Sequence, residues 1–254
     1  MIKFFRKVRQ KLLTENKFSK YLIYALGEIL LVVVGILIAV AINNSQQNKS
    51  LLKKEQTYLK GLQEEFNTSK RKLNELLEVN KQNYLGAKTI IESISNPNRS
   101  LNEKQFSELL FHSFSSDISF NANNSLLNEI VNSGSLKDIS NSKLRTRLTN
   151  WQSTLEDIAR QEQELSNQRV KVLDMFTTDK NSIRTILEEI NPNSEINFHS
   201  YKERVSNLNL LESLEFENNI IMFYLTSKAT EASHYKPLMK ELNSILELLQ
   251  KEIE

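Results

Sequence analysis

The sequence contains no cysteine and little glycine or proline. Without cysteine, its 254 residues form no disulfide and offer no thiolate nucleophile or cysteine-bound metal site. Its five glycines and three prolines are far fewer than the average usage of about 7% and 5% would give. Since many turns need these two residues, the chain must consist of few, long elements. Leu, Glu, Lys, Gln and Asn dominate the composition, so we predict an all-α protein.

Sequence motifs of known active sites are also absent. The glycines lie too far apart for a phosphate-binding loop, and neither a nucleophile elbow nor a calcium loop occurs. His112, His199 and His234 are far apart and have no acidic residue at a metal-binding spacing, so we interpret them as surface or packing residues. The carboxylate pairs Glu64–Glu65 and Glu188–Glu189 are typical of solvated helix faces. We therefore predict no catalytic residue, no bound metal and no cofactor.

One long apolar stretch runs from Tyr21 to Ile42 and contains a single charged residue, Glu28. At ~1.5 Å per residue its 22 residues would reach roughly 33 Å as a helix, against about 30 Å for the hydrocarbon core of a bilayer. We predict a single transmembrane helix over residues 21–42. It separates a basic, amphipathic cytoplasmic segment, residues 1–20, from an extracytoplasmic helical domain, residues 43–254.

Positive charge is concentrated before this stretch. Residues 1–20 hold seven basic residues against Glu15, a net +6; because the whole chain carries +2, the remainder carries −4. This distribution argues against nucleic-acid binding and favours contact with a lipid membrane that bears anionic headgroups. Four lysines in the twenty residues after the stretch, against seven basic residues before it, predict a cytoplasmic N-terminus and a periplasmic C-terminal domain at the cell inner membrane. The basic residues expected at the membrane surface include Lys3, Arg6, Lys7, Arg9 and Lys11.

Three residues on one side of the predicted membrane helix point to a helix partner. Glu28, Gly35 and Ala39 fall within about 40° of one another at ~100° per residue. Gly35 and Ala39 would let a second helix approach closely, and an intramembrane carboxylate is costly against lipid. We predict that this face contacts a partner protein or a second copy of the chain. The alternative for Glu28 is that its side chain reaches the cytoplasmic interface.

Apolar residues repeat every seven positions in three segments beyond the membrane stretch, which predicts three long helices. The first segment ends at Asn96-Pro97, because proline cannot continue a helix. In the third, Pro237 either kinks the helix or begins a new one. Three such helices, with shorter ones between them, predict an elongated antiparallel helical bundle. The repeating residues are Leu52, Leu59, Phe66, Leu73, Ala87 and Ile94; Leu144, Trp151, Ile158, Leu165 and Val172; and Ile221, Leu225, Ala232, Tyr235, Met239, Leu242, Leu246, Leu249 and Ile253.

The segments between the long helices carry capping signals. Ser100 and Glu103 form a predicted capping box that opens a short helix through Phe111. A second short helix covers residues 126–132 and is followed by Gly134, for which we predict a left-handed conformation.

Polar and aromatic residues interrupt the apolar pattern. Five polar side chains occupy core positions of the repeat; they form a buried polar layer or, as we favour, mark places where the face turns toward solvent. Three phenylalanines near the first loop cap the bundle, as we favour, or face a partner protein. The polar residues are Asn80, Asn83, Glu162, Arg169 and Lys228, and the phenylalanines are Phe111, Phe114 and Phe120.

Two stretches, IKFFRKVRQKLL at residues 2–13 and KYLIYALGEILLVVVGILIAVAINN at residues 20–44, resemble a known family. It is an uncharacterised family of bacterial single-pass inner-membrane proteins, defined by a domain of unknown function. A weaker similarity lies at Ser133–Leu136, where the family has a Gly-Leu turn before a long helix. The resemblance implies a membrane location and supplies no activity.

These observations favour a non-enzymatic, membrane-anchored scaffold or protein-interaction module of the bacterial envelope. The alternative is a sensor or signalling subunit that passes a periplasmic signal through the transmembrane helix; it would need a membrane partner for output, because only the short N-terminal segment lies inside. An enzyme is a third alternative. The expected partners are the lipid membrane and a protein or second copy bound through the transmembrane helix, with no nucleic acid.

Overall fold

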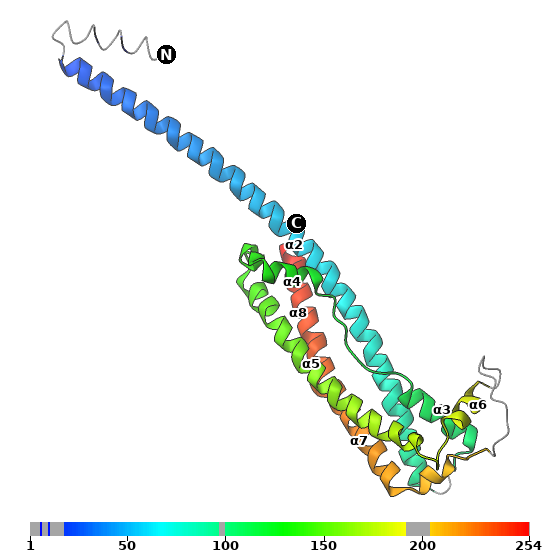
Figure 1. Ribbon diagram of the computed structural model, residues 1–254. Helices are drawn as coiled ribbons and strands as arrows, with labels where there is room; N and C mark the ends of the chain where they lie inside the picture. The colour runs from blue at the N-terminus through cyan, green and yellow to red at the C-terminus, as the bar shows by residue number, and fades with distance from the viewer. Residues whose placement is uncertain (1–5, 7–9, 11–17, 97–99, 192–203, 254) are drawn as a thin grey trace. The chain divides into compact units, whose positions relative to one another are not determined.

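The structure, a computed structural model, describes residues 6, 10, 18–96, 100–191 and 204–253. Its regular elements in these residues are all helical, with no strand, which confirms the predicted all-α class (Figure 1). The chain divides into two compact units, Met1–Gln56 and Thr57–Glu254.

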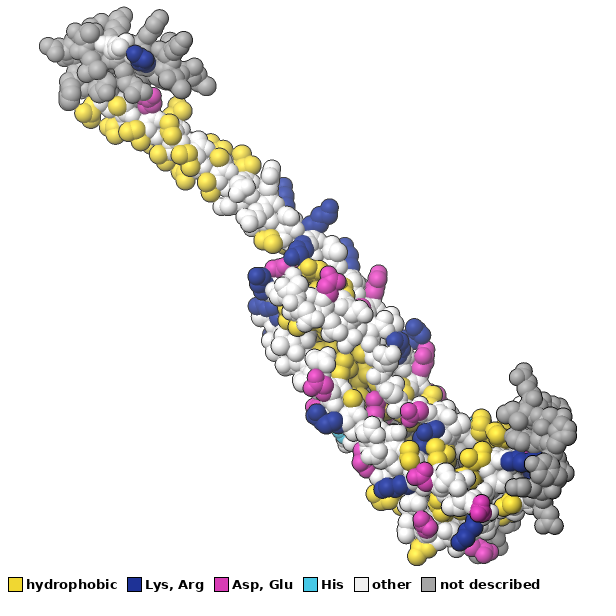
Figure 2. Space-filling view, viewed as in Figure 1, with side chains coloured by type: hydrophobic (Ala, Val, Ile, Leu, Met, Phe, Trp, Pro, Cys, Tyr) yellow, Lys and Arg dark blue, Asp and Glu magenta, His cyan; other side chains and the backbone are white. Residues whose placement is uncertain are grey.

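The described part of the first unit belongs mainly to helix α2 (Phe18–Ile94), which continues into the second unit. From Ala25 onward this helix is long and apolar enough to cross a membrane, and its most apolar stretch is not buried within the protein. Fourteen large apolar side chains between Leu22 and Ile42 are 45–72% exposed, and hydrophobic side chains cover this part of the helix in Figure 2. Leu52, predicted as the first member of the buried repeat, is also exposed, so the buried repeat begins at Leu59.

The second unit holds the rest of α2 and the later elements, which are α3 (Glu103–Phe114), α4 (Ser125–Asn132), η2 (Ser135–Asp138), α5 (Ser142–Asp174), η3 (Met175–Thr177), α6 (Ile183–Ile190), η4 (Leu208–Glu212), α7 (Leu214–Thr230), η5 (Glu231–Tyr235) and α8 (Lys236–Glu252). Helix α5 packs against α7 and α8, and α3 packs against α6 (Figure 1).

Aromatic pairs join helices that are distant in sequence. The ring centroids of Phe66 in α2 and Trp151 in α5 are 5.0 Å apart, and those of Phe114 in α3 and Phe223 in α7 are 4.8 Å apart.

Most helix ends lie close to their predicted places. Helix α2 ends at Ile94, before the Asn-Pro sequence, and Gly134 adopts the expected left-handed conformation with φ 69°. The predicted capping box of α3 is wrong by two residues. The N–H of Gln105 donates to the Asn102 side chain at 2.9 Å, and the N–H of Asn102 donates back to the Gln105 side chain at 3.1 Å. Glu103, predicted to complete the box, binds another segment instead.

Helix α4 receives its N-terminal cap from a side chain of α2. Its own N-cap residue, Asn124, makes no side-chain hydrogen bond. Instead, the Glu65 carboxylate accepts hydrogen bonds from the backbone N–H groups of Leu126 and Leu127 at 2.7 and 3.2 Å. A carboxylate at this end of a helix also complements the helix dipole. The interpretation of Glu65 as a solvated residue is therefore wrong, whereas Glu64 is exposed.

An extra residue between α7 and α8 shifts the buried face of this helix pair. Buried positions are three or four residues apart up to Thr230, and the next is Tyr235, five residues later. A π-turn, η5, spans this gap and ends with the N–H of Lys236 donating to the carbonyl of Glu231, an i→i+5 bond. The buried residues are Phe216, Ile220, Phe223, Ser227 and Thr230 before the gap, and Tyr235, Leu238, Leu242, Ile245 and Leu249 after it.

The π-turn explains why the predicted face of this last segment is partly wrong. Leu225 and Ala232 are exposed rather than buried. The predicted repeat assumes regular α-helical spacing from α8 back into α7, and the extra residue of the π-turn breaks that spacing, so the positions it selects before Tyr235 lie off the buried face. Tyr235, Leu242 and Leu249, which lie beyond the gap on the assumed phase, are buried as predicted. Of the two alternatives for Pro237, the structure has the second, since this residue lies in the first turn of α8.

We expect Glu65→Ala to lower the free energy of unfolding of the second unit by about 1–2 kcal/mol, because two N–H groups of α4 lose their acceptor. Glu64→Ala is the matched control and should change it by less than about 0.5 kcal/mol. Trp151 is the sole tryptophan and is 1% exposed, so its fluorescence can follow urea unfolding of the full chain. Equal effects of the two substitutions would contradict the cap.

Candidate functional site

The predicted membrane contact face lies in the described part of α2. Gly35 and Ala39 are exposed and Glu28 is half-buried. A Cβ added at Gly35 would have no side chain or other helix of the protein within 4 Å, so the space for a second helix is open. Arg6, one of the predicted membrane-surface residues, is also exposed. The other four, Lys3, Lys7, Arg9 and Lys11, lie outside the described residues, as does His199.

Three of the five polar residues at core positions are buried, contrary to the favoured prediction. Asn80 is 0% exposed and its side-chain amide donates to the Ser227 carbonyl of α7 at 3.2 Å. Asn83, at 1%, donates to the His112 carbonyl of α3 at 3.0 Å with its amide nitrogen turned toward that atom. Glu162 is buried as well. The side chains of Arg169 and Lys228 reach solvent, as favoured, with Arg169 half-buried and Lys228 exposed.

A buried carboxylate on α5 joins three parts of the second unit. Oε1 of Glu162 accepts hydrogen bonds from the Tyr235 hydroxyl of the π-turn and from the Phe120 N–H of the loop after α3, both at 2.8 Å. Burial raises the pKa of Glu162 above its usual 4.5 by more than these two hydrogen bonds lower it. Burial and the neighbouring carboxylate also raise the pKa of Tyr235, which therefore stays a neutral donor. Since both side chains are buried away from solvent, we interpret the pair as a structural junction.

On its other side the π-turn contacts α2. Glu231 forms an ion pair with Lys236 at 2.8 Å. Burial alone would raise the pKa of Glu231, but hydrogen bonds from Lys236 and Tyr84 outweigh it and lower the pKa. Burial and Glu231 raise the pKa of Tyr84 to about 12, and the Lys228 ammonium stands 4.8 Å from the Tyr84 ring centroid. The π-turn is thus tied to α5 through Tyr235 and to α2 through Glu231.

A groove of about 710 Å³ separates parts of α5 and α8. It is crossed by an ion pair between Arg147 and Glu241 and is also lined by Asp157 and His234. The His234 Nδ1 atom is buried and has no hydrogen-bond partner among the described residues. No group of three or more His, Asp or Glu side chains in the described part of the chain could hold a metal ion. The lining has mixed charge.

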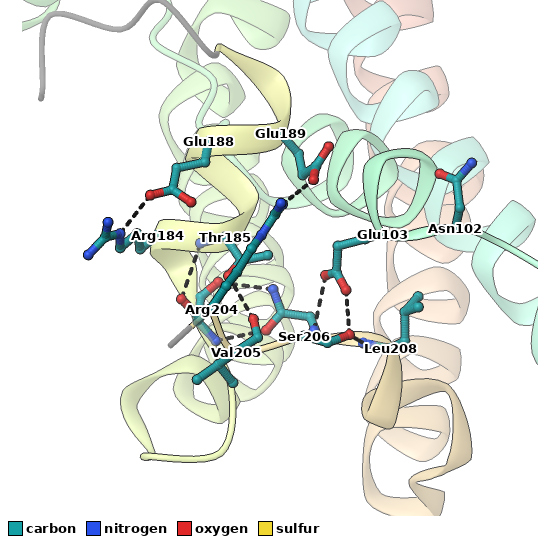
Figure 3. A network of polar contacts seen from close by, with 12 residues as sticks. Asn102, Glu103, Arg184, Thr185, Glu188, Glu189, Arg204, Val205, Ser206 and Leu208 are labelled. Atoms are coloured by element: carbon teal, nitrogen blue, oxygen red, sulfur yellow. Dashed lines mark hydrogen bonds and ion pairs between the residues drawn. The ribbon is translucent and has the colours of Figure 1, made fainter. Parts of the chain in front are cut away.

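A polar network fixes the segment before η4 against α3 and α6 (Figure 3). Asn207 is 0% exposed; its side chain accepts from the Ser182 N–H at 2.7 Å and donates to the Ser182 carbonyl at 2.9 Å. Its backbone N–H donates to Glu103 at 3.0 Å, and the Thr185 hydroxyl donates to the Val205 carbonyl at 2.7 Å. The carboxylates of α6 are likewise paired, Glu188 with Arg184 and Glu189 with Arg204. These polar groups form hydrogen bonds and ion pairs with one another, so we interpret the network as one that holds segments of the fold together.

The three phenylalanines near the first loop have different environments. Phe114 is 3% exposed and packs on Phe223, and Phe120 contacts the core, so these two close the bundle as favoured. Phe111 is 38% exposed and is not part of this cap.

In comparisons with known proteins, no family model, no curated protein and no solved structure matches the chain. The family resemblance of residues 2–44 stays a prediction. The sequence placed both Glu162 and Tyr235 at core positions of their repeats but did not predict the hydrogen bond between them, because the π-turn that positions Tyr235 has no recognisable sequence signal.

The stabilising contribution of protonated Glu162 should be lost as the pH rises from 4.5 through its folded pKa, since the folded protein then holds a buried charge. Glu162→Gln keeps an acceptor for Tyr235 and Phe120 without that charge. We expect the variant to gain stability relative to the wild type between pH 4.5 and pH 7.5, on the order of 1 kcal/mol.

Urea unfolding followed by Trp151 fluorescence measures this difference. Glu156→Gln, an exposed position of the same helix, is the control and should show no such trend. A stability difference between the Glu162→Gln variant and the wild type that is constant over this pH range would contradict the prediction.

Proposed function

We propose that this chain is a membrane-anchored helical scaffold or protein-interaction module of the bacterial envelope, without enzymatic activity. The observation that carries the proposal is the row of fourteen large apolar side chains, 45–72% exposed, between Leu22 and Ile42. Leaving a side chain of this size in water instead of burying it costs about 1.5–3 kcal/mol. A row of this length and width therefore requires a lipid environment or another apolar surface.

The proposed arrangement has residues 21–42 spanning the inner membrane once, with residues 43–254 as an elongated antiparallel helical bundle in the periplasm. The charge of +6 on residues 1–20 supports a cytoplasmic N-terminus. The packing of α5 against α7 and α8 supports the bundle, and the resemblance of residues 2–44 to a single-pass membrane family fits the same arrangement.

The proposed partner binds through the membrane helix. The open space at Gly35 supports close approach of another helix on the face that also holds Glu28 and Ala39. The buried side chains of Asn80, Glu162 and Asn207 support a scaffold rather than an enzyme, because each is hydrogen-bonded to another segment of the chain.

A periplasm-dependent reporter fused after Glu254 should be active if the chain has this orientation. The same reporter placed before Met1 is the control and should be inactive, because it stays in the cytoplasm. Reversed activities of the two fusions would overturn the proposed orientation, and activity of neither would argue against membrane insertion.

Pairing of two copies can be tested with single cysteines, since the chain has none of its own. We expect Ala39→Cys to form a disulfide-linked product in oxidised native membranes, because this residue lies on the contact face. Ala41→Cys, about 160° from Ala39 around the helix at ~100° per residue, is the matched control and should remain monomeric. A product of a different mass would identify a partner protein, and equal crosslinking at both positions would reject the face.

A further inference from the structure

An apolar groove of the second unit lies where α3, the end of α5 and α6 meet. Its volume is about 270 Å³. Phe114, Phe176 and Ile186 form its floor and are buried. Phe111 and Ile183 line it as well, and they are 38% and 51% exposed. The groove therefore combines an apolar floor with an apolar rim that faces solvent.

One cation, Arg169, stands in the wall of this groove. Its Nε donates to the Phe114 carbonyl at 2.9 Å, which fixes the guanidinium beside the apolar floor. No carboxylate among the described residues pairs with it. Other arginines of the second unit do form such pairs: Arg71, Arg147, Arg160, Arg184 and Arg204. A half-buried guanidinium whose η nitrogens have no anion is suited to an anionic group brought by a ligand.

We propose that this groove binds a free medium-chain fatty acid, with the alkyl chain on the apolar floor and the carboxylate on Arg169. Ligand sites of this kind are mostly apolar, with few polar groups that fix the orientation of the ligand. The groove is at the small end of ligand-site volumes, which suits a single short alkyl chain. The groove is too small for a phospholipid with two long chains, and the single guanidinium matches the planar carboxylate of a free fatty acid. This site does not depend on the scaffold role.

Binding of octanoate to the full chain in lipid nanodiscs tests the proposal, with empty nanodiscs measured in parallel to subtract partition into lipid. Calorimetric titration should show saturable binding of octanoate and at least about tenfold weaker binding of octanol, which has the same chain without the carboxylate. Arg169→Met should weaken octanoate binding at least about tenfold, since it removes the charged donor.

Arg145→Met is the matched control, because Arg145 lies on the same helix and also donates to backbone carbonyls, outside the groove. It should leave octanoate binding within about twofold of the wild type. Ile183→Glu, at an exposed rim position, is a second variant that places a negative charge beside the ligand and should weaken binding without touching Arg169. Trp151 fluorescence shows whether Arg169→Met folds. If it does not, the comparison of octanoate with octanol and the Ile183→Glu variant decide whether the groove binds the fatty acid.

Three results would overturn the proposal. The first is no saturable binding beyond that of empty nanodiscs. The second is equal affinity for octanoate and octanol, which would remove the role of the carboxylate. The third is loss of octanoate binding to the same extent in the Arg145→Met control. A crosslinker at Phe111 that captures another protein, with no octanoate binding, would assign the groove to a protein partner instead.

Discussion

The second unit depends on one strip of apolar side chains along α5, because its other long helices pack around this helix. The strip faces α7 and α8 and, through Trp151 and Phe66, α2. Each large side chain fully buried there contributes about 1.5–3 kcal/mol. The ion pairs of this unit are mostly exposed, such as Arg71 with Glu75, and are worth about 0–1 kcal/mol each. The strip consists of Leu144, Leu148, Trp151, Ile158, Leu165 and Val172.

Apolar contact brings the helices together without deciding where the connecting segments lie. Directed hydrogen bonds do so at a few buried or half-buried positions. Glu65 fixes the start of α4, Glu162 fixes the loop at Phe120, and Asn207 fixes the segment before η4. Each of these residues binds backbone N–H groups of a segment distant in sequence, and backbone groups buried in this way need a partner. A single apolar strip and a few such contacts together specify this fold.

The long helices and Gly134 could be predicted from sequence, because apolar spacing and left-handed geometry are local properties. The start of α3 could not, since Ser100 and Asn102 are both good caps and the choice depends on Glu103 binding elsewhere. The role of Glu65 depends on where α4 lies, which no local pattern contains. The membrane contact face could be predicted from the sequence, because its three residues lie on one helix. The groove at Arg169 could not, because its lining comes from α3, α5 and α6, which are distant in sequence.

The π-turn ties the register of α8 to the length of the chain. If one residue between Glu231 and Tyr235 were deleted, the turn would become ordinary α-helix and α8 would rotate by about 100°. Leu238, Leu242 and Leu249 would leave the core although their sequence was unchanged. During evolution, substitutions on the solvent-exposed side of this segment cost little stability, whereas insertion or deletion of a single residue costs the buried contacts of α8. Among related chains, the number of residues between α7 and α8 should vary less than the residues themselves.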